Sequence, residues 1–191
     1  YQELQSMAKK HHATFGVEGS VMSGTPTMRL GEELLSGAII QKIEGILNGT
    51  TNYILSQMET GMSYADALAE AQSKGYAEAD PTGDVEGFDA AGKVAILANV
   101  LMNVPLKVSE VEREGISKLT LEHIQEAKAA GERWKLIGRL ERAEDTIKAS
   151  VKPQRVPLSH PLAGVMGATN AITYTTDFLG QTTVIGAGAG R

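Results

Sequence analysis

Residues 134–152 read WKLIGRLERAEDTIKASVK, two runs of strand-forming side chains separated by the polar pair Glu144-Asp145. Runs of this kind on either side of a short polar turn are typical of a β-hairpin. We therefore predict paired strands at 134–142 and 146–152, joined at the acidic pair.

The other elements follow from the spacing of apolar residues along the chain. Further strands are predicted at 14–21, 38–47, 171–176 and 182–185. Helices are predicted at 28–35, 53–61, between the N-cap Ser63 and Gly75, at 85–102 and at 121–130, with a loop at 76–83. Strands gather late and helices early, so the predicted class is α+β rather than a strict βαβ alternation. We expect a two-layer domain in which helices cover one face of a mixed sheet, with the dinucleotide-binding (Rossmann) domain largely absent.

The composition is that of an ordinary globular domain. The chain has 191 residues, 42% hydrophobic and 21% charged, enough for a single well-formed core. The formal net charge of -5 argues against nucleic acid or an anionic membrane as the main partner. Because there is no cysteine, disulfides, thiolate metal sites and cysteine nucleophiles are excluded. Neither a secretory signal nor a membrane-spanning run is found, so we expect a cytoplasmic protein.

Both ends of the sequence look like cuts in a longer polypeptide. The chain opens directly in a helical pattern and closes on GAGAG at 186–190, immediately after a predicted strand. Repeated glycines can mark a dinucleotide-binding turn, but that motif leads into a helix and has a different spacing. We therefore treat 1–191 as one domain, truncated at both ends.

Chemistry-bearing side chains concentrate in GYAEADPTGDVEGFDAAGK, residues 75–93. Asp89 and Lys93 are four residues apart, so a helix places them on one face. The preceding loop brings Glu78 and Asp84 toward the start of that helix. Carboxylates there could hold the ammonium of an amino-acid substrate, with the lysine beside a reacting oxygen.

Structural explanations fit the same spacing. An Asp-to-Lys pair four residues apart stabilises a surface helix by about 0.2–0.5 kcal/mol, and Asp84 could simply cap the helix. A calcium loop is a third interpretation, but the stretch lacks the Asp-x-Asp-x-Asp-Gly pattern with a glutamate at the twelfth position. On spacing alone, the structural explanations are the stronger ones.

A resemblance changes that balance. Residues 71–93 resemble the signature of homoserine dehydrogenases at each fixed position, Lys93 included. Three further segments resemble the same family in the right order, namely EGSVMSGTP at 18–26, GILNGTTNYIL at 45–55 and NAI at 170–172. With the terminal GAGAG, the resemblance covers essentially the whole chain.

The resemblance implies an oxidoreductase that interconverts L-homoserine and L-aspartate 4-semialdehyde with NAD or NADP. That reaction lies on the route to threonine, methionine and isoleucine. The cofactor would be bound mainly by a domain missing from this sequence, so we expect negligible NAD(P) affinity for residues 1–191 alone. The family forms dimers through the sheet of this domain, which implies a homodimer.

The resemblance also assigns roles position by position. Lys93 matches the lysine that exchanges a proton with the substrate oxygen, and Asp89 stands beside it as the second catalytic residue. The resemblance implies that the substrate is bound by Glu78, Asp89, Asp84, Tyr76, Gly49 and Thr50. It implies that the cofactor is contacted by Gly75 and Gly190. It also implies a sodium site formed by Glu18 and the main-chain carbonyls of Val21, Ser23 and Thr25.

Two other interpretations stay open. The chain could be a non-catalytic dimerisation or amino-acid-binding module that keeps the fold, or part of another dehydrogenase with a related second domain. The pair of Asp89 and Lys93 favours the enzyme, because a binding module does not need it.

Overall fold

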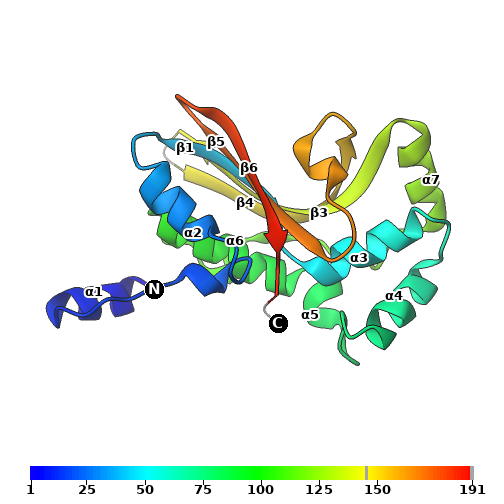
Figure 1. Cartoon of the computed structure of the whole chain (residues 1–191), viewed down its shortest axis with the longest axis horizontal. Coiled ribbons are helices and arrows are strands. Elements are labelled where there is room, and N and C mark those ends of the chain that lie inside the picture. The colour runs from blue at the N-terminus through cyan, green and yellow to red at the C-terminus, as the bar shows by residue number, and fades with distance from the viewer. Residues whose placement is uncertain (145, 190–191) are drawn as a thin grey trace.

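The computed structural model describes residues 1–144 and 146–189, without the side chains at 2 and 34. Its centre is a six-stranded mixed sheet in the order β2-β4-β3-β1-β5-β6 (Figure 1). The strands are β1 (Ile40–Ile46), β2 (Glu112–Arg113), β3 (Glu132–Ala143), β4 (Thr146–Pro157), β5 (Thr169–Thr176) and β6 (Gly180–Ala187). β2 runs parallel to β4, whereas the other neighbouring strands run antiparallel.

Helices form a second layer beneath one face of this sheet (Figure 1). The helices of the described residues are α1 (Gln2–Lys10), α2 (Thr27–Arg29), α3 (Gly49–Met58), α4 (Tyr64–Ser73), α5 (Thr82–Val85), α6 (Phe88–Leu101) and α7 (Leu121–Ala129), of which α1 lies outside this layer. Single turns are η1 (Glu18–Ser20), η2 (Leu30–Leu34), η3 (Val108–Glu110) and η4 (Pro161–Gly164). The predicted two-layer α+β class, with a mixed sheet covered on one face, is therefore confirmed.

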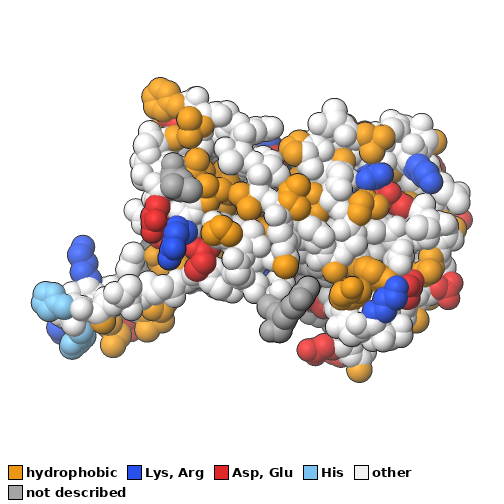
Figure 2. Space-filling view, in the orientation of Figure 1, with side chains coloured by type: hydrophobic (Ala, Val, Ile, Leu, Met, Phe, Trp, Pro, Cys, Tyr) orange, Lys and Arg blue, Asp and Glu red, His pale blue; other side chains and the backbone are white. Residues whose placement is uncertain are grey.

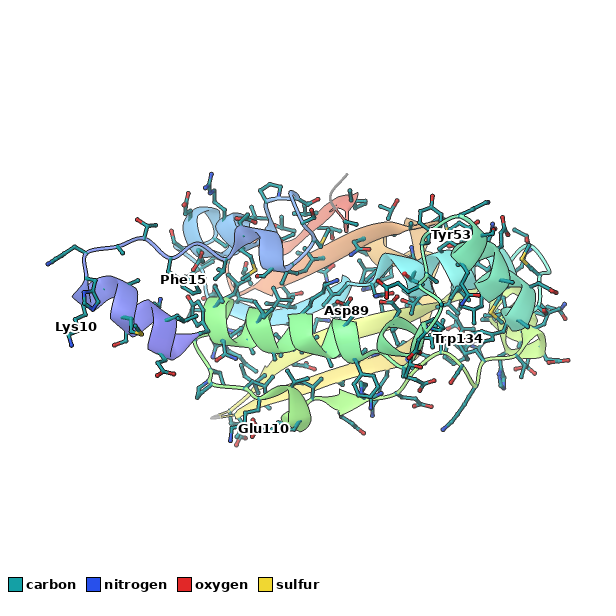
Figure 3. All side chains as sticks on the ribbon, turned by 90° about the horizontal axis from the view of Figure 1, so that it is seen from below. Lys10, Phe15, Tyr53, Asp89, Glu110 and Trp134 are labelled. Atoms are coloured by element: carbon teal, nitrogen blue, oxygen red, sulfur yellow. The ribbon has the colours of Figure 1, made fainter. Side chains whose placement is uncertain are left out.

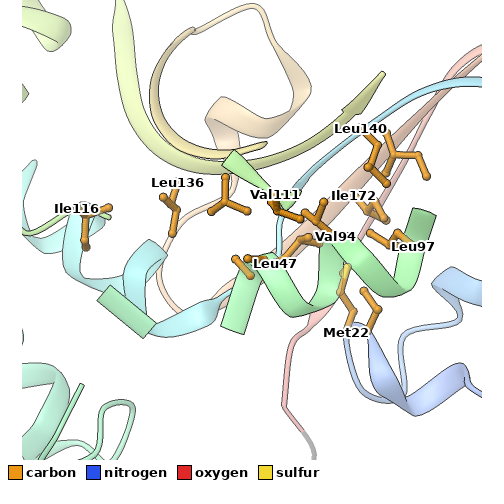
Figure 4. Close-up of a cluster of buried hydrophobic side chains, with 14 of the residues drawn as sticks. Met22, Leu47, Val94, Leu97, Val111, Ile116, Leu136, Leu140 and Ile172 are labelled. Atoms are coloured by element: carbon orange, nitrogen blue, oxygen red, sulfur yellow. The ribbon is translucent and has the colours of Figure 1, made fainter. Parts of the chain in front are cut away.

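The core lies between the sheet and α6. Leu140 and Ile172 point down from the sheet onto Val94 and Leu97 of α6, with Leu47 at the end of β1 (Figure 4). Each of these side chains is at most 1% exposed, and burying one stabilises the fold by about 1.5–3 kcal/mol. The apolar spacing on α6 thus fixes which of its faces meets the sheet.

A smaller apolar cluster lies on the opposite face of the sheet, at one end. There η4 and the loop after it place Leu162 and Val165 against Ile46 and Ile137. Among the described residues, no helix covers the rest of this face (Figure 1).

α1 extends away from the body of the domain, and His11 and His12 lie exposed at its far end (Figures 1 and 2). No helix of the described residues has the length and apolar character required to span a bilayer.

The hairpin prediction at 134–152 is confirmed, and its strands are longer than expected, with twelve residues in each of β3 and β4.

The strand predicted at 14–21 is wrong. Residues 18–20 form the single turn η1, and residues 14–21, all of which the structure describes, contribute no strand to the sheet. The Glu18 carboxylate accepts hydrogen bonds from the backbone N–H groups of Met28 (3.0 Å) and Arg29 (2.8 Å), which holds this segment as a turn against α2.

The helix predicted at 85–102 is confirmed as α6, but it begins at Phe88 rather than at Val85. Gly87 separates it from α5, and the φ of +78° at Gly87 lies in the left-handed region that glycine adopts at little cost. The carbonyl of Val85 accepts from the backbone N–H of Ile116 (2.8 Å), a tertiary contact that ends α5. The loop predicted at 76–83 therefore ends in the short helix α5. The two-residue edge strand β2 was not predicted.

Candidate active site

A cavity of about 910 Å³ lies where the end of β1, the first turns of α3 and α6, and the end of β6 meet. It is lined by Asn48, Gly49, Thr50, Gly75, Tyr76, Asp84, Asp89, Lys93, Ala168, Thr169 and residues 186–189. Carboxylates, an amine and the main chain of several loops therefore line one cavity that is open to solvent on one side.

Lys93 is held on two sides at the floor of this cavity. Its Nζ lies 2.7 Å from Oδ2 of Asp89 and donates to the main-chain carbonyl of Leu47 at 2.8 Å. Asp89 lies on the end of α6 that faces α3 (Figure 3), one helical turn before Lys93. The Lys93 side chain is 17% exposed and that of Asp89 38%, so the carboxylate is the more open partner. The amine is thereby fixed while it still faces the cavity.

Asn48 connects three elements around the same point. Its Oδ1 accepts from the backbone N–H of Thr51 at 2.9 Å, which caps α3. Its Nδ2 donates to Oδ1 of Asp84 at 2.7 Å and to Oδ2 of Asp89 at 2.9 Å. One buried amide thus sets the positions of both carboxylates relative to the start of α3.

The facing wall of the cavity is built by close main-chain packing. A Cβ on Gly49 would lie 2.7 Å from the carbonyl oxygen of Ala168, closer than real Cβ atoms approach. The Thr50 hydroxyl donates to the carbonyl of Tyr76 at 2.5 Å. The Tyr76 ring lies 4.7 Å, centroid to centroid, from that of Tyr53. α3 therefore meets the loop before β5 on one side and the loop after α4 on the other.

A sequence model for a family described as homoserine dehydrogenase matches residues 26–191. The chain belongs to the homoserine dehydrogenase family. The NAD(+)-dependent homoserine dehydrogenase of Pseudomonas canavaninivorans is 50% identical over 99% of this chain and 54% of its own length.

Solved structures of the homoserine dehydrogenase family share the fold. The crystal structure of a homoserine dehydrogenase from Thiobacillus denitrificans gives a TM-score of 0.94 at 41% identity, over 98% of this chain and 44% of that one. A hyperthermophilic archaeal homoserine dehydrogenase mutant in complex with NADPH gives 0.84 at 35% identity, over 100% of this chain and 55% of that one. The chain thus spans about half the length of these relatives.

Most of the residues that the family resemblance singles out meet in the cavity. They are Lys93, Asp89, Asp84, Tyr76, Gly49, Thr50 and Gly75. Glu78 does not line it: the residue is exposed, and its main-chain carbonyl accepts from the Gln72 amide at 3.0 Å. Gly190, the second predicted cofactor contact, lies outside the described residues.

Asp80, in the same acidic loop, has a structural role. Its Oδ1 accepts from the backbone N–H of Thr82 at 3.1 Å, at the start of α5. Hydrogen bonds from the Thr82 side chain and backbone lower the pKa of the Asp80 carboxyl.

Among residues 1–144 and 146–189, no group of three or more histidine, cysteine or acidic side chains is placed to hold a metal ion.

The four residues predicted for a sodium site share one turn before α2. The Glu18 carboxylate is committed to the backbone of α2, and the Val21 carbonyl accepts from the Thr27 hydroxyl at 3.0 Å. Ser23 has a φ of +51°, which curls the main chain. The Thr25 hydroxyl donates to the carbonyl of Ala187 at 3.1 Å, so the turn touches the end of β6. The carbonyl of Thr25 also accepts from the backbone N–H of Thr27 at 2.7 Å, so the Glu18 carboxylate and the carbonyls of Val21 and Thr25 all take part in hydrogen bonds.

Sequence reasoning missed Asn48, Ala168 and Thr169. For Asn48 there was a usable pattern, because an asparagine directly before a helix is a favoured N-cap. Ala168 and Thr169 carry no such pattern. They reach the cavity through a loop whose path depends on packing with α3.

Proposed function

We propose that this chain supplies the substrate pocket and the proton-transfer lysine of an enzyme that interconverts L-homoserine and L-aspartate 4-semialdehyde with NAD(P). The observation that carries the proposal is the amine of Lys93, 2.7 Å from the Asp89 carboxylate in a cavity that Asp84 also lines. The membership of the chain in the homoserine dehydrogenase family supports it.

The cavity suits both ends of an α-amino acid. The carboxylates of Asp84 and Asp89 attract an ammonium, and charge-assisted hydrogen bonds would orient it. At the start of α3, the first backbone N–H groups have no intrahelical partner, and the helix dipole favours an anion such as the substrate carboxylate. We assign the ammonium to the two aspartates and leave the exposed Glu78 as an outer contact.

Lys93 is the group that moves the proton. When homoserine is oxidised, Nζ as a neutral amine takes the proton of the substrate hydroxyl and becomes an ammonium, and in the reverse direction the ammonium returns that proton. Asp89 and the Leu47 carbonyl hold Nζ in place during both steps. A bound nicotinamide cofactor would accept the hydride from the hydroxyl-bearing carbon.

Glycine main chain on the cavity wall fits a flat cofactor ring. Gly75 has a φ of +74° and open space where a Cβ would stand, and Gly188 lies on the same cavity. These residues would contact the ring, with the rest of the cofactor bound beyond this chain. The relatives named for NAD(+) and for NADPH support a nicotinamide cofactor without choosing between the two.

A chimera tests the proposal. Residues 1–191 would replace the matched segment of the Pseudomonas canavaninivorans relative, and turnover of L-homoserine would be assayed with NAD⁺ and with NADP⁺. We expect turnover with at least one cofactor. An inactive chimera that still binds L-homoserine would support the non-catalytic module instead.

A homodimer, a sodium ion and a cytoplasmic location belong to the same proposal. The dimer is supported by the face of the sheet that no helix covers. The charged side chains on this face are paired with one another, since Glu44 lies 2.7 Å from Lys42 and 3.4 Å from Arg139. Sedimentation as a monomer at high concentration would count against the dimer.

Broadening of the sodium NMR line by the chain tests the cation site. The cytoplasmic location is supported by the biosynthetic reaction itself.

A further inference from the structure

Lys135 is a completely buried cation that does not line the cavity. It lies on β3, and its Nζ donates to the Val165 carbonyl at 2.6 Å and to Oδ1 of Asn52 at 3.0 Å. Burying an ammonium costs free energy unless it is hydrogen-bonded, so these contacts keep the side chain in place. Both partners belong to segments that lead to the cavity.

Lys135 and Asn52 both donate hydrogen bonds to one segment, residues 163–169, which we name the pocket strap. The Asn52 Nδ2 donates to the strap carbonyls of Val165 (3.2 Å), Gly167 (2.8 Å) and Thr169 (3.1 Å). Ser56 Oγ accepts from the Gly167 N–H at 3.0 Å. Side chains of α3 and β3 thus bind the strap along its whole length, and these contacts join residues far apart in the sequence.

Arg133 holds the other end of the strap. Its Nη1 donates to the Ala163 carbonyl at 3.0 Å, and its Nε lies 3.2 Å from Oε2 of Glu59 on the segment after α3. The cations of β3 therefore bind two carbonyls of the strap, at Ala163 and Val165.

The strap ends in the wall of the cavity. Ala168 and Thr169 both line it, and the Ala168 carbonyl lies against Gly49 at the first turn of α3. A shift of the strap would therefore move part of the lining of the cavity that Asp89 and Lys93 also line. Those two residues are carried by α6, a different element.

We infer that Lys135 is a positioning residue for the substrate pocket, acting through Asn52 and the strap. The ammonium is a pure donor, so it turns Oδ1 of Asn52 toward itself and leaves Nδ2 to face the strap carbonyls. Lys135 thereby sets the orientation of the amide that holds Gly167 and Thr169. The inference deepens the proposed function and rests on it.

Two variants in the active chimera test the inference. Lys135→Met removes the ammonium at similar size. Asn52→Asp keeps an acceptor for the buried Lys135 but removes the donor to the strap carbonyls, and circular dichroism checks that the fold is kept. We expect the KM for L-homoserine to rise about tenfold to hundredfold in each variant, with kcat within about threefold, because the reacting groups are on α6. The double variant should be no worse than the more affected single variant, since both act on one network.

Lys148 is an exposed lysine on the neighbouring strand β4, so Lys148→Met is the matched control and should leave KM unchanged.

Hydrogen exchange of the Gly167 and Thr169 amides in this chain gives a readout that needs no turnover. We expect both variants to speed it at least about tenfold, a sign that the strap has loosened. Unchanged KM and unchanged exchange in an active chimera would overturn the inference. An inactive unmodified chimera with the exchange effect intact would instead count against the proposed function.

Discussion

Among single residues, Lys93 is the one on which the proposed proton transfer depends. Its neighbours Asp89 and the Leu47 carbonyl accept hydrogen bonds from Nζ and hold it in place. In the proposed reaction Lys93 takes up the hydroxyl proton as a neutral amine and returns it as an ammonium.

Lys93→Ala in the chimera should lower turnover by about 10²–10⁴, the usual contribution of general acid–base catalysis. Steady-state kinetics measures the loss, and circular dichroism confirms that the fold is kept. Lys148→Ala serves as the control. A rate close to that of the unmodified chimera would remove Lys93 from the role.

Gly49→Ala should disrupt the cavity wall through a single methyl group. The new Cβ would meet the Ala168 carbonyl at 2.7 Å, so the strap or α3 must move, at a cost of about 1–3 kcal/mol in unfolding free energy. Denaturant titration measures the cost. Gly83→Ala is the matched control, because nothing lies within 4 Å of a Cβ there and alanine is the better helix former. Equal stabilities of the two variants would contradict the close packing.

Among the elements, α3 does most to organise the site. Its N-cap Asn48 touches both aspartates, and its next turn carries Asn52, which holds the pocket strap. The start of one helix therefore links the acidic side of the cavity to the opposite wall.

Asn48→Ala should lower both stability and activity. Loss of the cap costs about 0.5–2 kcal/mol of unfolding free energy, and Asp84 and Asp89 lose their shared donor. Ser63→Ala removes the N-cap of α4 at a residue that does not line the cavity, and should cost a similar amount without lowering activity. Denaturation and kinetics on both variants separate the two effects. Equal activity in both would mean that the Asn48 bridge is unimportant to the site.

For the whole molecule, the buried Lys135 couples folding to pH. Burial lowers the pKa of Lys135 from 10.5 to about 8, partly opposed by the charge of Glu59 and assisted by that of Arg133. A buried ammonium therefore works against folding wherever it stays protonated.

The unfolding free energy should rise with pH between about 8 and 10.5, relative to Lys135→Met. Below about pH 8 the lysine is protonated in both the folded and unfolded chains, so it adds no pH dependence. Between about pH 8 and 10.5 Lys135 stays protonated in the unfolded chain but has lost its proton in the folded chain. The unfolding free energy therefore rises by an amount on the order of 3 kcal/mol across this pH range. Urea titrations of both proteins at several pH values measure the difference. A difference that does not change with pH would show that Lys135 titrates normally.

By itself the sequence determined the hairpin of β3 and β4, most helices, and the pairing of Asp89 with Lys93, because each depends on periodicity within one segment. Only the tertiary structure decided that Gly87 separates α5 from α6 and that residues 18–20 form a turn rather than part of a strand, since both follow from contacts with distant segments. It also decided that Asn48 bridges Asp84 and Asp89, 36 and 41 residues away, and that Ala168 and Thr169 reach the cavity. Contacts of this kind depend on how the layers pack, which spacing along the chain does not encode.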